Sequence, residues 1–281
     1  MDNPKSKIGI FLAITFALSA LTWVPIVREG DLGAGGGLYI LATMWCPGVA
    51  AILTRLVTQR NLRGMGWIPR RPGLLALAYV LPIFYALPVY AIGWVAGLGA
   101  FDPTKWAVGP ELTPVTGLLM IGSVGALMGL VSATGEEIGW RGLLVPELAK
   151  VTGFRNVALI SGTIWAAWHM PLMILADYRG EGTPLWYSLL CFAAMIVALS
   201  FIMAWITLKS KSFWPAALLH STHNLFIQGV FDSATIEGPS AYWWTSEFGA
   251  GLAIAVSLVA LLVVRSSKKG GSERGRRTVA A

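Results

Sequence analysis

The sequence predicts an all-α polytopic membrane protein with about eight transmembrane helices. Of its 281 residues, 56% are hydrophobic and only 12% are charged, whereas soluble domains carry about 25% charged residues. Apolar runs long enough to cross a bilayer recur along the whole chain. The polar stretches, residues 1–7 and the tail from about Arg265, are too short to form a soluble core. Most of the surface is therefore expected to face lipid.

Each apolar run is close to the roughly 20 residues that a transmembrane helix needs. The runs are residues 8–27, 37–57, 73–99, 113–135, 156–176, 184–208, 213–231 and 247–264. The first run follows Lys5 and Lys7 and so resembles a signal peptide, but it exceeds the roughly 7–15 apolar residues of such a segment. We interpret it as a retained first span.

The distribution of lysine and arginine predicts that both termini are cytoplasmic. With the N-terminus inside, only Arg28, Lys105 and Arg179 of the 21 lysines and arginines fall in outer connections, which is the bias that the positive-inside rule requires. The basic tail from Arg265 to Arg277 is then interpreted as an anchor at an anionic leaflet. The compact chain and its lack of targeting signals favour a multi-pass protein of a bacterial plasma membrane.

Neither nucleic-acid binding nor a site built from cysteines is expected. The net charge of +7 is compatible with nucleic-acid binding, but the basic residues lie in loops and form no patch interleaved with aromatic residues, so no nucleic-acid partner is expected. The two cysteines, Cys46 and Cys191, fall inside apolar runs. They are interpreted as small buried hydrophobic residues rather than a disulfide or a metal pair.

The segment 134–142 places Glu136, Glu137 and Arg141 in apolar surroundings. Charges there are costly unless they pair or face a wet cavity, so the cluster indicates a functional site. In a helix, Glu137 and Arg141 are one turn apart and can pair. Glu136 lies about 100° around the helix from Glu137, so its side chain is free to contact a different group. We expect the fourth helix to continue past Glu136 toward Pro146, which would submerge both carboxylates.

All three histidines of the chain, His169, His220 and His223, lie in the second half in or near predicted spans. Asn224 follows His220 by one helical turn. A lone intramembrane histidine is most often a hydrogen-bonded structural residue, but three of them beside a Glu-Glu pair favour a site. The sequence predicts a polar pocket that is built from three helices and opens toward the cytosolic leaflet.

Three motifs occur in order on successive predicted spans: Glu-Glu-x-x-x-Arg at 136–141, aromatic-x-x-x-His at 165–169 and His-x-x-x-Asn at 220–224. Each motif alone is weak, but their order and spacing resemble the CPBP family, which comprises the CAAX prenyl proteases and bacteriocin-processing proteins and is also called ABI. The resemblance covers about residues 115–230. One departure is Trp165, which stands where the family usually has Phe.

The resemblance implies an intramembrane endopeptidase. Carried over to this chain, Glu136 and His169 would activate a water, and His220 and Asn224 would bind the developing oxyanion. Chemistry supports this division, because amide hydrolysis needs a base near neutral pH and donors aimed at the tetrahedral oxygen. Asn224 offers an NH₂ donor and His220 an imidazole N–H.

The other residues near the motifs are expected to support the site. By the resemblance, Glu137 and Arg141 would hold the glutamate helix, and Trp165 opens the second motif. Trp140, Trp165 and Trp168 would line an entrance or, as is commoner at helical spacing, pack in the core. His223 has no place in the family pattern and is interpreted as structural.

The involvement of a metal stays open at this point. Glu136, His169 and His220 are a plausible two-histidine, one-carboxylate set for zinc. Against this, the chain has no His-Glu-x-x-His helix, and a glutamate–histidine water site needs no ion.

These interpretations divide the chain into three parts: residues 1–112 with helices 1–3, residues 113–231 as the catalytic core with helices 4–7, and residues 232–281 with the last helix and the basic tail.

The expected substrate is a peptide, a leader sequence or a membrane protein. In a bacterium a prenylated CAAX tail is not expected to be the substrate. The alternative function is a non-proteolytic immunity or scaffold protein that binds a peptide or a membrane partner in the same cavity. A transporter is disfavoured because the sequence shows no strong internal repeat.

Overall fold

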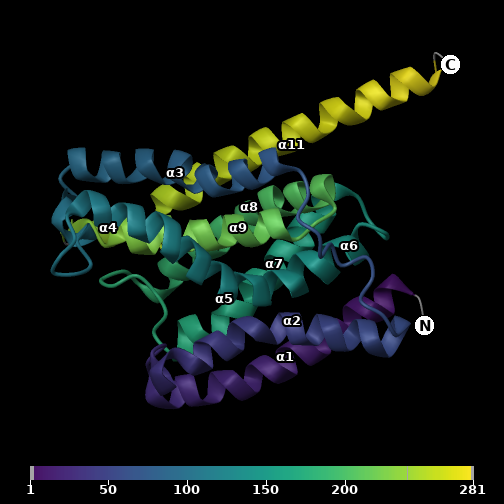
Figure 1. The fold of residues 1–281 in the computed structure, drawn as a ribbon, viewed down its shortest axis with the longest axis horizontal. Coiled ribbons are helices and arrows are strands. Elements are labelled where there is room, and N and C mark those ends of the chain that lie inside the picture. The colour runs from purple at the N-terminus through teal and green to yellow at the C-terminus, as the bar shows by residue number, and fades with distance from the viewer. Residues whose placement is uncertain (1–2, 239, 280–281) are drawn as a thin grey trace.

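A computed structural model describes residues 3–238 and 240–279 as a bundle of helices that run roughly along one direction (Figure 1). Its longer helices are α1 (Pro4–Glu29), α2 (Leu38–Gln59), α3 (Pro72–Val95), α5 (Ala126–Gly139), α7 (Phe154–Leu175), α8 (Leu185–Ser210), α9 (Trp214–Asn224) and α11 (Ala250–Val279). Its shorter helical segments are η1 (Ala34–Gly37), η2 (Pro103–Trp106), α4 (Pro114–Met120), η3 (Ile121–Gly125), η4 (Trp140–Leu144), α6 (Val145–Leu148), η5 (Leu225–Asp232) and α10 (Ala241–Trp244).

The beginning of α1 and the end of α11 lie at the same end of the bundle (Figure 1). This end, which we name the termini end, also carries the α2–α3 and α6–α7 connections. The α1–α2 and α7–α8 connections lie at the opposite end, named the distal end. The two ends define the direction in which the helices would cross a bilayer.

Within the described residues, seven helices are long and apolar enough to cross a membrane. The chain is therefore an all-α, multi-pass membrane protein, as predicted. The eighth predicted run, residues 213–231, is helical as α9 followed by η5 but is not among those seven. The polar sequence from His220 to Asn224 at its centre makes this run less hydrophobic than the others. The orientation of the termini and the three-part division of the chain stay predictions, and the side chains of the basic tail from residue 268 onward lie outside the described part.

The fourth span extends well beyond the predicted residues 113–135. It runs through α4, η3, α5, η4 and α6 as one helical stretch, Pro114–Leu148, of 35 residues. This confirms that the helix continues past Glu136 toward Pro146. The π-helical turns η3 and η4 interrupt it, and such turns are frequent at functional sites. Glu136 and Glu137 are buried, with 1% and 0% of their surfaces exposed.

α8 is the central helix of the bundle. It has the highest mean hydropathy of the seven candidate spans, 2.6, and 61% of its most apolar window is buried. A helix that is apolar on all sides is expected in the interior. α8 packs against α7, α9 and α11, so two of the helices that carry predicted site residues lie directly on it.

Two glycines one turn apart, Gly135 and Gly139, allow α5 to approach α2 closely. A Cβ atom built at Gly135 would lie 2.7 Å from Cγ of Trp45, and one at Gly139 would lie 2.5 Å from Cβ of Pro47. Small residues at this spacing let the backbones of membrane helices come together. Because the two glycines enclose the Glu-Glu pair, this contact fixes the depth and rotation of both carboxylates.

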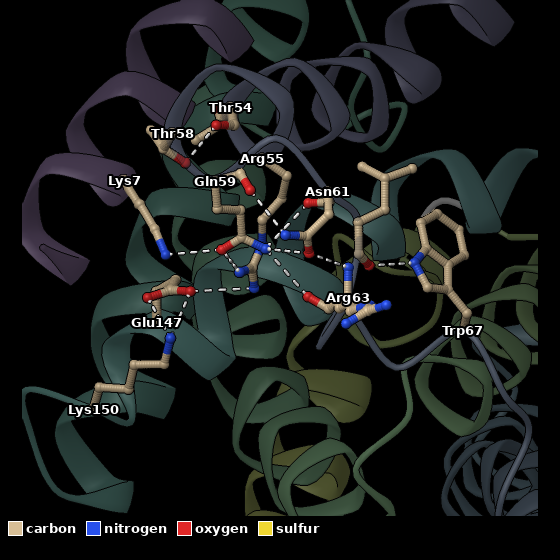
Figure 2. Close-up of polar contacts among 11 residues, drawn as sticks. Lys7, Thr54, Arg55, Thr58, Gln59, Asn61, Arg63, Trp67, Glu147 and Lys150 are labelled. Carbon is tan, nitrogen blue, oxygen red and sulfur yellow. Dashed lines mark hydrogen bonds and ion pairs between the residues drawn. The ribbon is translucent and has the colours of Figure 1, made fainter. Parts of the chain in front are cut away.

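A buried polar network ties α1, α2 and α6 together at the termini end (Figure 2). Arg55 Nη2 lies 3.2 Å from Glu147 Oε1, and Lys7 Nζ donates to Gln59 Oε1 at 2.9 Å. Lys150 Nζ pairs with Glu147 at 2.8 Å. Buried charges need such partners to offset their loss of hydration, so this network fixes the register of the three helices.

A short antiparallel ribbon joins distant parts of the chain at the distal end. β1 (Gly99–Phe101) pairs with β2 (Thr235–Glu237), with Ala100 opposite Ile236. The sequence did not predict these strands, because three residues carry too little pattern to be recognised. The ribbon connects the end of α3 to the segment that precedes α11.

Candidate active site

The four residues predicted to carry the chemistry line one cavity of about 200 Å³. Glu136 comes from α5, His169 from α7, and His220 and Asn224 from α9. The four residues therefore share one pocket, but α2 and α8 line it as well as the three predicted helices. Trp165 and Trp168 on α7 also line it.

Glu136 is held by two indole N–H groups. Its Oε2 accepts hydrogen bonds from Trp165 Nε1 at 2.7 Å and from Trp140 Nε1 at 3.2 Å. Hydrogen bonds to a charged carboxylate are stronger than those between neutral groups, so the two indoles hold the Glu136 side chain in place. The sequence predicts only that Trp140 and Trp165 pack or line an entrance, whereas in the structure both make a direct polar contact with the buried carboxylate.

Nε2 of His169 has no hydrogen-bond partner among the described residues. Its Nδ1 lies 2.9 Å from the carbonyl oxygen of Trp165. A carbonyl only accepts, so Nδ1 carries the hydrogen and Nε2 of the neutral ring keeps a lone pair. The ring packs against Trp168 and Phe192, with centroid distances of 4.9 and 5.1 Å. These contacts fix the plane of the imidazole.

Glu137 connects Arg141 to His220. Arg141 Nη1 donates to Glu137 Oε1 at 2.8 Å, which confirms the predicted pair. The same oxygen lies 3.0 Å from His220 Nδ1, a contact that the sequence did not predict. Arg141 Nη2 also donates to Ser200 Oγ at 3.3 Å, and its guanidinium stacks 4.2 Å from the centroid of the Trp165 ring. Glu137 therefore orients the histidine of the third motif as well as the arginine of the first.

A second polar cluster, of which the sequence pointed only to His223, lines the same cavity. It comprises His223, Tyr178, Gln228 and Glu247. Tyr178 Oη and Gln228 Nε2 both donate to Glu247 Oε2 at 3.1 Å, and His223 Nε2 lies 3.4 Å from Glu247 Oε1. Burial raises the pKa of Tyr178 well above its ordinary value, and the neighbouring Glu247 carboxylate raises it further, so the phenol keeps its proton and donates. An acidic residue at the start of the last apolar run was the available sequence signal for Glu247.

The cavity extends toward the distal end of the bundle. Its lining includes Leu32 in the α1–α2 connection and Tyr178 in the α7–α8 connection. A neighbouring cavity of about 480 Å³ shares Leu32, Tyr178, Gln228 and Glu247 with it. The sequence predicts that the pocket opens at the cytosolic end, where the termini are also expected. In the structure, the lining of the cavity continues toward the distal end instead.

The donor arrangement expected of a zinc site is not found in the described part of the chain. No three histidine, cysteine, aspartate or glutamate side chains there gather closely enough to hold a metal ion. Glu136, His169 and His220 line one cavity, but they do not form such a group. The residues present therefore do not fit the zinc set, and the chemistry below uses protein groups and water alone.

Comparison with known proteins finds two similarities. A family model described as type II CAAX prenyl endopeptidase, Rce1-like, matches residues 115–226. CAAX prenyl protease 2 of Methanococcus maripaludis is 32% identical to this chain over 242 residues, which covers 79% of the chain and 83% of that protein. The segment that the family model matches contains all three motifs whose residues line the cavity.

Proposed function

Because the chain belongs to the family of Rce1-like type II CAAX prenyl endopeptidases, we propose that it hydrolyses a peptide bond in the cavity formed by Glu136, His169, His220 and Asn224. One observation carries this proposal. A carboxylate held by two indole N–H groups and an imidazole with a free Nε2 line the same small cavity. The pair supplies two acceptors for one water molecule.

In the proposed reaction, a water lies between Glu136 and His169 and attacks the substrate carbonyl. Glu136 takes the proton of the water, and His169 Nε2 orients the water by accepting its other hydrogen. The proton then passes from Glu136 to the leaving amine. General base catalysis by a positioned side chain typically contributes a factor of about 10²–10⁴ in rate.

The tetrahedral oxygen is proposed to lie between His220 and Asn224. The Nδ1 of His220 faces Glu137, so Nε2 is the nitrogen available to the substrate. Because the hydrogen on Nδ1 faces Glu137, the proposed role requires the imidazolium form of His220, in which Nε2 carries a hydrogen as well. The NH₂ group of Asn224 supplies a second donor, and donors of this kind stabilise the charge that develops in the transition state.

The substrate class is proposed to be a peptide or membrane-protein segment that enters from the bilayer. The name of the relative refers to a prenylated tail of the form Cys-aliphatic-aliphatic-X, so prenylated and unprenylated peptides are both relevant probes. Cleavage near the cytosolic leaflet, as the sequence analysis expected, requires a path from the termini end to Glu136. The lining of the cavity instead continues toward the distal end, so the orientation of the chain decides which leaflet is involved.

The test compares the purified wild type with Glu136→Gln and His169→Ala in nanodiscs. The matched control is Glu111→Gln, because Glu111 is an exposed glutamate that does not line the cavity. A farnesylated CAAX peptide and an unprenylated peptide library are the probes, and cleavage is followed by mass spectrometry. We expect both site variants to lower kcat by a factor of about 10²–10⁴, with unchanged folding and an active control.

Two results would contradict the proposal. Cleavage by a folded Glu136→Gln variant at the wild-type rate would remove the glutamate from the mechanism. A wild type that cleaves no probe, together with a cellular phenotype that survives Glu136→Gln, would favour the alternative of a non-proteolytic binding protein.

A further inference from the structure

A second cavity, of about 600 Å³, lies at the termini end and shares no lining residue with the candidate active site. It is formed by the α2–α3 connection, by residues of η4 and α6, and by the end of α8 with the turn that follows it. Its described lining contains four cationic side chains and no acidic one. They are Arg63, Arg70, Arg141 and Lys211. Glu137 offsets the charge of Arg141, which leaves three cations without a counter-charge in the lining.

Two buried polar atoms of this lining have no hydrogen-bond partner. They are Nε of Arg141 and Oγ1 of Thr207, in residues that are only 1% and 3% exposed. Buried donors without partners are rare, and each one needs an explanation. Arg141 Nε can only donate and the Thr207 hydroxyl can donate, so both residues bring an unused donor to the wall of the cavity.

The wall of the cavity is held in place by hydrogen bonds. Trp214 Nε1 donates to the Trp67 carbonyl at 2.6 Å, and Ser212 Oγ donates to the Gly66 carbonyl at 3.1 Å. Gly66 has a φ of +78°, and a Cβ there would lie 2.8 Å from Cα of Ser212, so only glycine permits this close approach. Within the connection, Gln59 and Trp67 make further bonds to the backbone (Figure 2). The backbone of the α2–α3 connection, which includes Arg63 and Arg70, is therefore positioned before any ligand binds.

The rim of the cavity combines cations with apolar side chains. Arg63, Arg70 and Lys211 are exposed, and none of them forms an ion pair within the described residues. Trp67 and Ile68 are 37% and 62% exposed in the same connection. Exposed tryptophan next to basic residues is typical of the headgroup region of a bilayer, where basic clusters bind anionic lipids.

We propose that this cavity binds a phosphate group, with the headgroup of an anionic phospholipid as the source that Trp67 and Ile68 favour. The phosphate oxygens accept from Arg141 Nε and the Thr207 hydroxyl at the buried side, and Arg63, Arg70 and Lys211 surround the group at the rim. Because Arg141 Nη1 also holds Glu137, a ligand in this cavity would bind a guanidinium that contacts the first motif. The proposal does not depend on the proposed peptidase activity.

The experiment uses the full chain in detergent micelles titrated with phosphatidylglycerol, phosphatidylcholine or inorganic phosphate. Native mass spectrometry measures the lipid retained, and intrinsic fluorescence follows thermal unfolding. The test variants are Thr207→Val, which removes only the hydroxyl, and the triple variant Arg63→Gln/Arg70→Gln/Lys211→Gln. The charge-matched control is Lys5→Gln/Arg60→Gln/Arg155→Gln, whose positions are exposed and lie outside the cavity lining.

We expect the apparent affinity for phosphatidylglycerol to fall roughly tenfold in the triple variant, since exposed ion pairs each contribute about a two- to fivefold factor. Thr207→Val should weaken binding severalfold, and the control should bind like the wild type. Thermal stabilisation by inorganic phosphate with no retained lipid would support the phosphate site and assign the free ion as its source. Equal retention of lipid by the triple variant and the control, with no response to phosphate, would overturn the proposal.

Discussion

At the scale of single residues, the most informative position is Trp165. The family that the motifs resemble usually has Phe here, and Phe could not make the 2.7 Å hydrogen bond that Trp165 Nε1 donates to Glu136. The same indole stacks on the Arg141 guanidinium, and its backbone carbonyl fixes His169. One residue therefore contacts three members of the motifs.

This predicts a specific defect for Trp165→Phe. The ring would keep most of its packing, but Glu136 would lose its shorter indole donor. A hydrogen bond to a charged group contributes about 1.5 kcal/mol or more, so we expect kcat/KM for peptide cleavage to fall about tenfold. Trp23→Phe is the control, because the buried Trp23 Nε1 has no hydrogen-bond partner. Equal activity of the two variants would show that the hydrogen bond to Glu136 is not used in the reaction.

At the scale of elements, the contact between α2 and α5 determines where the carboxylates lie. Gly135 and Gly139 enclose the Glu-Glu pair, and both lie so close to α2 that a side chain there would collide with it. The π-helical turn η4 begins one residue after Gly139 and contains Arg141. Close packing before this turn and the altered helical geometry within it together set the direction of Arg141 relative to Glu137.

Gly139→Ala is therefore expected to destabilise the protein by about 1–3 kcal/mol, the usual cost of overpacking a dense interior. The control is Gly9→Ala in α1, where an added Cβ meets no atom within 4 Å. Alanine there should leave stability unchanged or raise it by up to about 1 kcal/mol. Denaturant unfolding followed by tryptophan fluorescence measures both variants. A Gly139→Ala variant as stable as the wild type would mean that α2 and α5 can separate at little cost.

At the scale of the whole molecule, two independent features bear on orientation. The bias of lysine and arginine predicts that the termini end is cytoplasmic, whereas the candidate active-site cavity extends toward the distal end. If both hold, the cavity faces the outer side of the membrane, and the substrate segment would reach it from that side.

Cysteine labelling in intact cells checks this orientation. In a Cys46→Ala/Cys191→Ala background, single cysteines replace Arg63 at the termini end or Glu181 at the distal end, both exposed positions. We expect an impermeant maleimide to label the cysteine at 181 in intact cells and the cysteine at 63 only after permeabilisation. The reverse pattern would make the distal end cytoplasmic, contradict the charge-based prediction, and leave the cavity open to the cytosol.

The sequence by itself determined the class of the protein and the identity of its polar centre. Apolar runs of the right length predict membrane helices because lipid leaves the backbone no other way to satisfy its hydrogen bonds. The cost of charge in that medium made Glu136, Glu137, Arg141 and the histidines conspicuous. Spacing along one helix also predicted the Glu137–Arg141 pair, since it depends only on helical geometry.

Only the tertiary structure decided which groups meet across helices. The hydrogen bond from Trp165 to Glu136, the link from Glu137 to His220, and the cluster around Glu247 join residues far apart in sequence. The direction in which the cavity opens and the separate basic cavity at the termini end likewise arise from the packing of connections. Local pattern carries no information about such contacts, because they are fixed by how close and at what rotation the helices pack.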